Sequence, residues 1–85
     1  EAYYMLGLLY LEDNNLDKCE EYSLKSFRKD PKCGDAYNLV GLALLKKGNL
    51  EESIQNFENA LRINPNHIKA QKNLKVARTL LKRQI

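Results

Sequence analysis

The chain has 85 residues, of which 44% are hydrophobic and 29% charged, and its formal net charge at pH 7 is +3. This length suits one small domain with a modest core, and the composition is ordinary for a globular chain. No apolar run reaches the roughly 20 residues that a membrane-spanning helix needs. The sequence therefore predicts no transmembrane segment.

Residues 1–12 are predicted to form a first helix, because apolar residues recur there at helical spacing. They form one stripe of Ala2, Leu6, Leu9 and Tyr10. A turn follows at 13–15, where asparagine can adopt the left-handed conformation that ends a helix. Residues 17–29 predict a second helix with the stripe Cys19, Tyr22, Ser26 and Phe27. Pro31 ends this unit, because the residue before a proline is disfavoured in the helical region.

The same scheme recurs further along the chain. Residues 35–47 predict a third helix, Gly48 and Asn49 a break, and residues 51–63 a fourth helix that Pro65 closes. A fifth helix is predicted at about 67–83, with the apolar positions Ile68, Ala70, Leu74, Ala77 and Leu81. The expected fold class is all-α, with five antiparallel helices.

An internal repeat underlies this scheme. A shift of 34 residues aligns 1–34 with 35–68 and gives nine identical pairs, where chance would give roughly two. The pairs are Ala2/Ala36, Tyr3/Tyr37, Gly7/Gly41, Leu8/Leu42, Leu11/Leu45, Asn15/Asn49, Leu16/Leu50, Arg28/Arg62 and Pro31/Pro65. A period of this length is typical of proteins built from stacked units.

The repeated residues resemble the motif of the tetratricopeptide repeat family, which has small residues where two helices touch, aromatic residues beside them and a closing proline. The second unit carries Tyr37, Val40, Gly41, Leu44, Ser53, Phe57, Ala60 and Pro65. The first unit carries Tyr3, Leu6, Gly7, Tyr10, Cys19, Ser23, Ser26 and Pro31. The resemblance implies helical hairpins stacked as a short right-handed α-solenoid: repeat 1 at 1–33, repeat 2 at 34–67 and a capping helix at 68–85.

Two departures from the motif carry expectations. Ser23 stands where the family usually has a large aromatic residue, and we expect the neighbouring Tyr22 to fill that space. In the fifth helix, Lys75 and Arg78 replace the equivalents of Gly41 and Leu44. Packing another helix on these charges would cost desolvation, so this helix is expected to cap the array.

In the family, the first helices of successive units line a concave groove. The resemblance therefore implies a partner-binding groove that consists of Tyr4, Leu8, Leu11, Asp35, Asn38, Leu42, Leu45, Lys46, Lys69, Lys72 and Val76. Its leucines predict an apolar strip that holds a helix or an extended peptide of a partner protein. The alternative, which stays open, is that these leucines pack inside the array.

The groove has a basic end. After residue 65 there are six bases and no acid, whereas the first 65 residues carry eight bases and eleven acids. A solvated face is the first interpretation of these bases, an acidic protein segment the second, and nucleic acid or a membrane surface the third. No aromatic residue is interleaved with them, so base stacking has no support.

Some members of the family hold a chaperone's terminal carboxylate with a clamp of basic residues and asparagine. Lys69 and Lys72, with Asn38 or Asn73, invite that comparison. The first helix, however, has Glu1, Tyr4, Met5 and Leu8 where lysine and asparagine would be needed. The clamp is incomplete, and we do not expect this specific activity.

No residue pattern in the sequence supports catalytic chemistry. His67 is the single histidine and falls in a turn, where a solvated or capping role is expected. Cys19 and Cys33 form no CxxC pattern, which predicts free thiols in a reducing, cytoplasmic compartment and no metal or cofactor. We predict a protein–protein interaction module, a scaffold or adaptor rather than an enzyme. The alternatives are a homo-oligomerisation module and the targeting domain of a larger enzyme.

Overall fold

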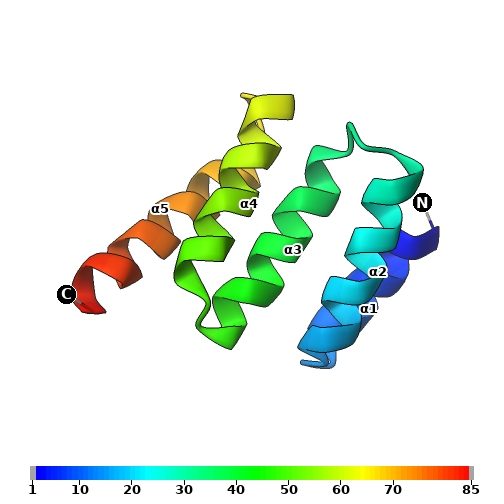
Figure 1. The fold of residues 1–85 in the computed structure, drawn as a ribbon, viewed down its shortest axis with the longest axis horizontal. Helices are drawn as coiled ribbons and strands as arrows, with labels where there is room; N and C mark the ends of the chain where they lie inside the picture. Colours follow the sequence, from blue (N-terminus) through cyan, green and yellow to red (C-terminus); the bar gives the residue numbers. More distant parts are fainter. Residues whose placement is uncertain (1, 85) are drawn as a thin grey trace.

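The computed structural model describes residues 2–84, and all the regular structure in them is helical (Figure 1). The helices are α1 (Ala2–Glu12), α2 (Leu16–Lys29), α3 (Gly34–Lys47), α4 (Leu50–Ile63) and α5 (Ile68–Gln84). Each boundary lies within one residue of the predicted one, so the all-α fold and its five helices are confirmed. Among residues 2–84, no helix has the length and apolar character needed to cross a bilayer.

Both hairpin turns pass through a residue with left-handed backbone, Asn14 with φ 60° and Gly48 with φ 87°. The next amide along the chain then bonds back into the helix: Asn15 to the carbonyl of Tyr10 at 2.8 Å and Asn49 to that of Leu44 at 2.9 Å. Glycine and asparagine adopt this conformation at the least cost. The predicted turns therefore produce the α1–α2 and α3–α4 hairpins.

The helices stack side by side. Each helix contacts the next one along the chain, and α1 and α5 also contact α3, whereas α2 and α4 make no contact with each other in residues 2–84. In Figure 1, α1 passes behind α2 and α5 behind α4, with α3 between the two pairs. The first helices of each unit thus converge on one side, here called the inner side, and α2 and α4 diverge on the outer side.

The core of the second repeat is filled by its own phenylalanine. Phe57 is completely buried, and its ring lies 2.5–2.9 Å from the point that a Cβ on Gly41 would occupy. The Ser53 hydroxyl donates to the Gly41 carbonyl at 2.8 Å and joins α4 to α3. Two small residues therefore let these helices approach closely around one large ring.

The core of the first repeat is filled by a residue of the second. A Cβ on Gly7 would meet the Leu39 side chain at 2.9 Å and the Ser23 hydroxyl at 3.1 Å, and Leu39 is 1% exposed. Tyr22 instead stacks on Tyr3 and Tyr10, with ring centroids 6.1 and 5.6 Å apart. The expectation that Tyr22 fills the space beside Ser23 is wrong, because adjacent residues of a helix point about 100° apart.

The predicted apolar stripe of α1 is mostly exposed. Gly7 is the only buried residue of this helix, while Leu9 is 56% and Leu6 36% exposed. One repeat later, the equivalents of these leucines, Ala43 and Val40, are at most 3% exposed. The hairpin α1–α2 covers α3, but no element among residues 2–84 covers this side of α1. In α5, Ile68 is likewise 62% exposed, against the predicted pattern.

Candidate functional site

The inner side presents a strip of four half-buried leucines, here called the leucine strip: Leu8, Leu11, Leu42 and Leu45. Leu8 and Leu11 pack against the core around Cys19 and Leu39, Leu45 packs against the core around Phe57, and Leu42 contacts both cores. The strip therefore supports the fold and leaves part of each side chain open. On α5, the predicted groove residue Val76 is 49% exposed.

Asn38 is less available than its place in the predicted groove suggests. It is 5% exposed, and its amide oxygen accepts a 3.0 Å hydrogen bond from the Asn73 side chain. This contact joins α3 to α5 across a distance of 35 residues. The oxygen of Asn38 is thus engaged in joining the helices rather than free for a partner.

Asp35 and His67 join the starts of α3 and α5. The His67 Nε2 atom lies 2.7 Å from an Asp35 oxygen, and His67 Nδ1 accepts the Ala70 amide N–H at 3.1 Å. Because Nδ1 accepts, this geometry assigns the ring proton to Nε2, which donates to Asp35. The capping role expected of His67 is confirmed, and its side chain is only 9% exposed.

Tyr4 marks one end of the inner side. Burial raises the pKa of its hydroxyl, and the nearby Asp35 and Cys33 raise this pKa further. The phenol therefore stays protonated and able to donate a hydrogen bond. Tyr4, Cys33 and Asp35 line a small pocket together with Ser26, Lys29 and Asp30.

The predicted groove lysines are exposed: Lys46, Lys69 and Lys72. Within residues 2–84, none of the three forms an ion pair. Lys46 lies on α3, and Lys69 and Lys72 lie on α5.

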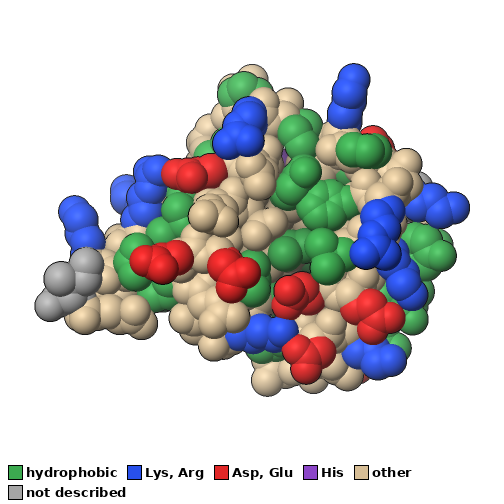
Figure 2. Space-filling model, viewed as in Figure 1, with side chains coloured by type: hydrophobic (Ala, Val, Ile, Leu, Met, Phe, Trp, Pro, Cys, Tyr) green, Lys and Arg blue, Asp and Glu red, His purple; other side chains and the backbone are tan. Residues whose placement is uncertain are grey.

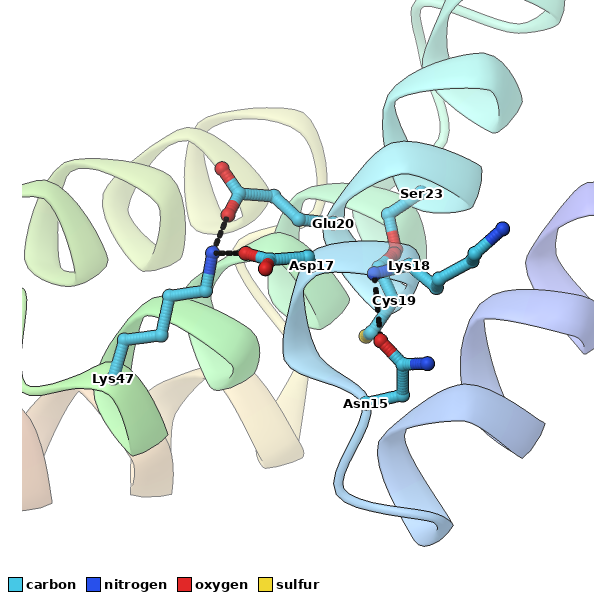
Figure 3. Close-up of polar contacts among 7 residues, drawn as sticks. All are labelled: Asn15, Asp17, Lys18, Cys19, Glu20, Ser23 and Lys47. Atoms are coloured by element: carbon cyan, nitrogen blue, oxygen red, sulfur yellow. Dashed lines mark hydrogen bonds and ion pairs between the residues drawn. The ribbon is translucent and has the colours of Figure 1, made fainter.

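Lys47 contrasts with these lysines, because its charge is used inside the protein. Its ammonium lies 2.6 Å from Asp17 and 2.8 Å from Glu20, and so ties α3 to α2 (Figure 3). These hydrogen bonds raise the pKa of Lys47, and the bond from Lys47 lowers the pKa of Asp17. Lys47 is therefore a structural cation rather than one available to a partner.

The cysteines are free thiols, as predicted. Cys19 is completely buried, and burial raises the pKa of its thiol, which keeps it in the unreactive protonated form. In the described part of the chain, no group of three or more His, Cys, Asp or Glu side chains is placed to hold a metal ion. The residues predicted to form the groove thus comprise partly exposed apolar side chains, three lysines and a phenol.

Stacked helical hairpins with small residues at their contacts define an all-α repeat protein. The tetratricopeptide repeat pattern matches residues 1–33 and residues 34–67, and the chain belongs to this family. It is 31% identical over 72 residues to the peroxisomal targeting signal receptor of Saccharomyces cerevisiae (strain ATCC 204508 / S288c). This alignment covers 85% of the chain but 12% of the receptor, so the chain spans a small part of that relative.

Sequence reasoning missed the two contacts that join α3 to α5. His67 and Asp35 are 32 residues apart, and Asn73 and Asn38 are 35 apart, close to the repeat length of 34. Residues separated by about one repeat lie at matching heights on neighbouring first helices. Scanning the sequence for polar partners at that separation would have indicated both pairs.

Proposed function

We propose that the chain is a protein–protein interaction module that holds a peptide or helix of a partner along the inner side, between α1, α3 and α5. The observation that carries this proposal is the leucine strip on α1 and α3, together with three exposed lysines on α3 and α5 that form no ion pair within residues 2–84. Half-buried leucines on a rigid scaffold offer apolar area whose transfer out of water favours binding. Because they also pack on the cores, little ordering is required when a partner arrives.

The lysines set the expected chemistry of the partner. Lys46, Lys69 and Lys72 favour a segment that carries acidic residues next to its apolar ones, mainly by accelerating encounter and fixing orientation. Binding should weaken as salt screens these exposed charges. The phenol of Tyr4 supplies a hydrogen-bond donor at one end.

The name of the yeast relative also supports a function in binding other proteins. That relative is named a peroxisomal targeting signal receptor. We therefore include a targeting signal among the partner segments that this chain would bind, as an adaptor or as the targeting part of a larger protein.

Peptide selection tests the proposal. A random peptide library is selected on the wild-type chain, and the affinity of the enriched peptide is then measured for variants. Leu8→Glu with Leu42→Glu should abolish binding. Because Leu42 contacts both cores, Lys69→Glu with Lys72→Glu serves as a second variant outside them, and we expect about tenfold weaker binding from it.

The matched control is Lys75→Glu with Lys82→Glu, which makes the same charge change on α5 beside a different crevice. It should leave the affinity within about twofold, because it removes no contact of the inner side. Equal weakening by both lysine pairs would contradict a role for the inner side and point to general electrostatic attraction.

A second candidate function is self-association through the open side of α1. Residues 2–11 contain no charged residue, and Met5 and Leu9 are each 56% exposed. Contiguous exposed apolar surface of this kind usually marks a contact. A light-scattering concentration series should show dimers that Met5→Lys with Leu9→Lys removes. A wild-type chain that stays monomeric at every concentration would exclude this function.

A further inference from the structure

The outer side carries an apolar pocket at the junction of the two repeats, here called the outer pocket. It is lined by Leu24, Phe27, Arg28, Pro31 and Tyr37 and has a volume of about 270 Å³. Figure 2 shows the corresponding hydrophobic surface over the region where α2 meets α3. This volume lies below the roughly 300–1,000 Å³ of pockets that take whole small molecules, so the outer pocket suits a single side chain.

The two aromatic residues of the pocket contact each other, whereas its leucine is exposed. The rings of Phe27 and Tyr37 meet edge to face with centroids 4.0 Å apart. Leu24, on the preceding turn of α2, is 38% exposed. An apolar side chain entering here would contact preformed aromatic edges and cover a leucine that now faces water.

The equivalent place one repeat later carries polar contacts. The counterparts of Leu24 and Tyr37 are Glu58 and Gln71. Gln71 donates to the Pro65 carbonyl at 2.8 Å, and Glu58 pairs with Arg78 at 2.9 Å. The shared repeat architecture therefore does not require apolar residues here, because the second junction has polar side chains at two of the matched positions.

Arg28 of the pocket lacks the side-chain hydrogen bond that its counterpart in the second repeat, Arg62, forms within residues 2–84. Arg62 is held by the side-chain oxygen of Asn59 at 2.8 Å. The residue equivalent to Asn59 is Lys25, which donates hydrogen bonds only and cannot hold Arg28. Arg28 is exposed and forms no ion pair with any residue in the range 2–84. Its planar guanidinium is well matched to a carboxylate.

We propose that the outer pocket is a second recognition site, which binds a partner segment carrying a large apolar side chain with a carboxylate next to it. The apolar side chain enters between Leu24 and the Phe27–Tyr37 pair, and the carboxylate pairs with Arg28. The site lies on the opposite side of the stack from the leucine strip, so its occupation does not compete with a partner there. Two weak contacts to one partner would then reinforce each other through effective concentration.

The test uses small probes and nuclear magnetic resonance of the isotope-labelled full chain. N-acetyl-phenylalanine carries both required groups, its primary amide lacks the carboxylate, and N-acetylglycine lacks the ring. We expect saturable shifts of backbone amides between Leu24 and Tyr37 with the first probe. Affinity for the amide should be about fivefold weaker, the modest effect of one exposed charge-assisted contact, and N-acetylglycine should cause no saturable shift.

Three variants locate the site. Leu24→Glu installs the residue of the second junction and should abolish the saturable shifts, while circular dichroism confirms an unchanged fold. Arg28→Gln should weaken the acid about fivefold and leave the amide unchanged. The matched control, Arg62→Gln, makes the same change at the second junction and should have no effect.

Three outcomes would overturn the proposal. They are equal affinity of the wild type for acid and amide, wild-type binding by Leu24→Glu, and saturable shifts confined to the leucine strip. Because the probes are read residue by residue, failure at the outer pocket is distinguishable from failure of the inner side to bind its own partner.

Discussion

The two repeats share one motif but fill their cores differently. In repeat 2, Phe57 packs on Gly41 of the same hairpin, whereas in repeat 1 Ser23 leaves room that Leu39 of the following hairpin occupies. Repeat 2 therefore supplies its own filling side chain, and repeat 1 depends on its neighbour. In a stacked array, the core belongs to the interface between units as much as to each unit.

The same positions can also have opposite environments. Met5 of α1 is 56% exposed, and its equivalent in α3, Leu39, is 1% exposed. The difference comes from what covers each helix rather than from residue type. Substitutions at matched positions of the two repeats separate the effect of what covers a helix from the effect of residue type. We expect their effects to decrease in the order given below.

The largest effect is expected from Phe57→Ala. Removing a completely buried ring should cost about 3–5 kcal/mol, a large part of the roughly 5–15 kcal/mol that holds a small domain together. The matched variant Ser23→Ala removes one hydrogen bond from the hydroxyl to the Cys19 carbonyl and should change stability by no more than about 1 kcal/mol. Urea unfolding of both variants measures the difference, and similar losses would refute the asymmetry.

Leu39→Ala should have the next largest effect, because it empties the space that Ser23 leaves beside Gly7. We expect about 2–4 kcal/mol. Met5→Ala, at the matched exposed position, should stay within about 0.5 kcal/mol in the monomer. Denaturant unfolding at low protein concentration provides the comparison, and a loss at Met5 as large as that at Leu39 would show that α1 is covered in solution.

Exchanging each packing glycine for alanine should give a smaller contrast. At Gly41, the new methyl would meet the Phe57 ring at 2.5–2.9 Å, and overpacking of about 1–3 kcal/mol should exceed the roughly 1 kcal/mol gained in helix propensity. At Gly7, the nearest atoms are the ends of the Leu39 and Ser23 side chains, which can move aside. Thermal unfolding should therefore place Gly41→Ala clearly below Gly7→Ala in midpoint temperature, and the reverse order would contradict this account of the two cores.

Lys47→Met should have the smallest effect, a fall of a few degrees in the midpoint temperature, as expected for an exposed ion-pair network. The pKa of Asp17 is lowered in the folded state from an ordinary 3.8, so its contribution is lost as the pH falls through the lower folded value. The pKa of Lys47 is raised from 10.5, so its contribution is lost as the pH rises above that value. The difference between wild type and variant should be largest between these limits and shrink in high salt, and a constant difference across the pH range would exclude the ion pairs as its cause.

Sequence patterns were sufficient for the helices, their ends and the family. Helical spacing, the Asn14 and Gly48 turns and the closing prolines act within a few residues, so their effects are readable along the chain. The predicted groove residues also come from α1, α3 and α5, which converge on the inner side. Their role in binding a partner stays a prediction of the repeat pattern.

Tertiary structure decided which surfaces are open. Leu6 and Leu9 follow the same helical spacing as buried residues, yet they are exposed to solvent. Asn38, predicted as a partner-binding residue, is hydrogen-bonded to Asn73. The Asp35–His67 contact and the difference between the two junctions also depend on how one hairpin is offset against the next. Local chemistry specifies the hairpins, but their offset is set by the combined packing of many side chains from both units, which no single stretch of sequence contains.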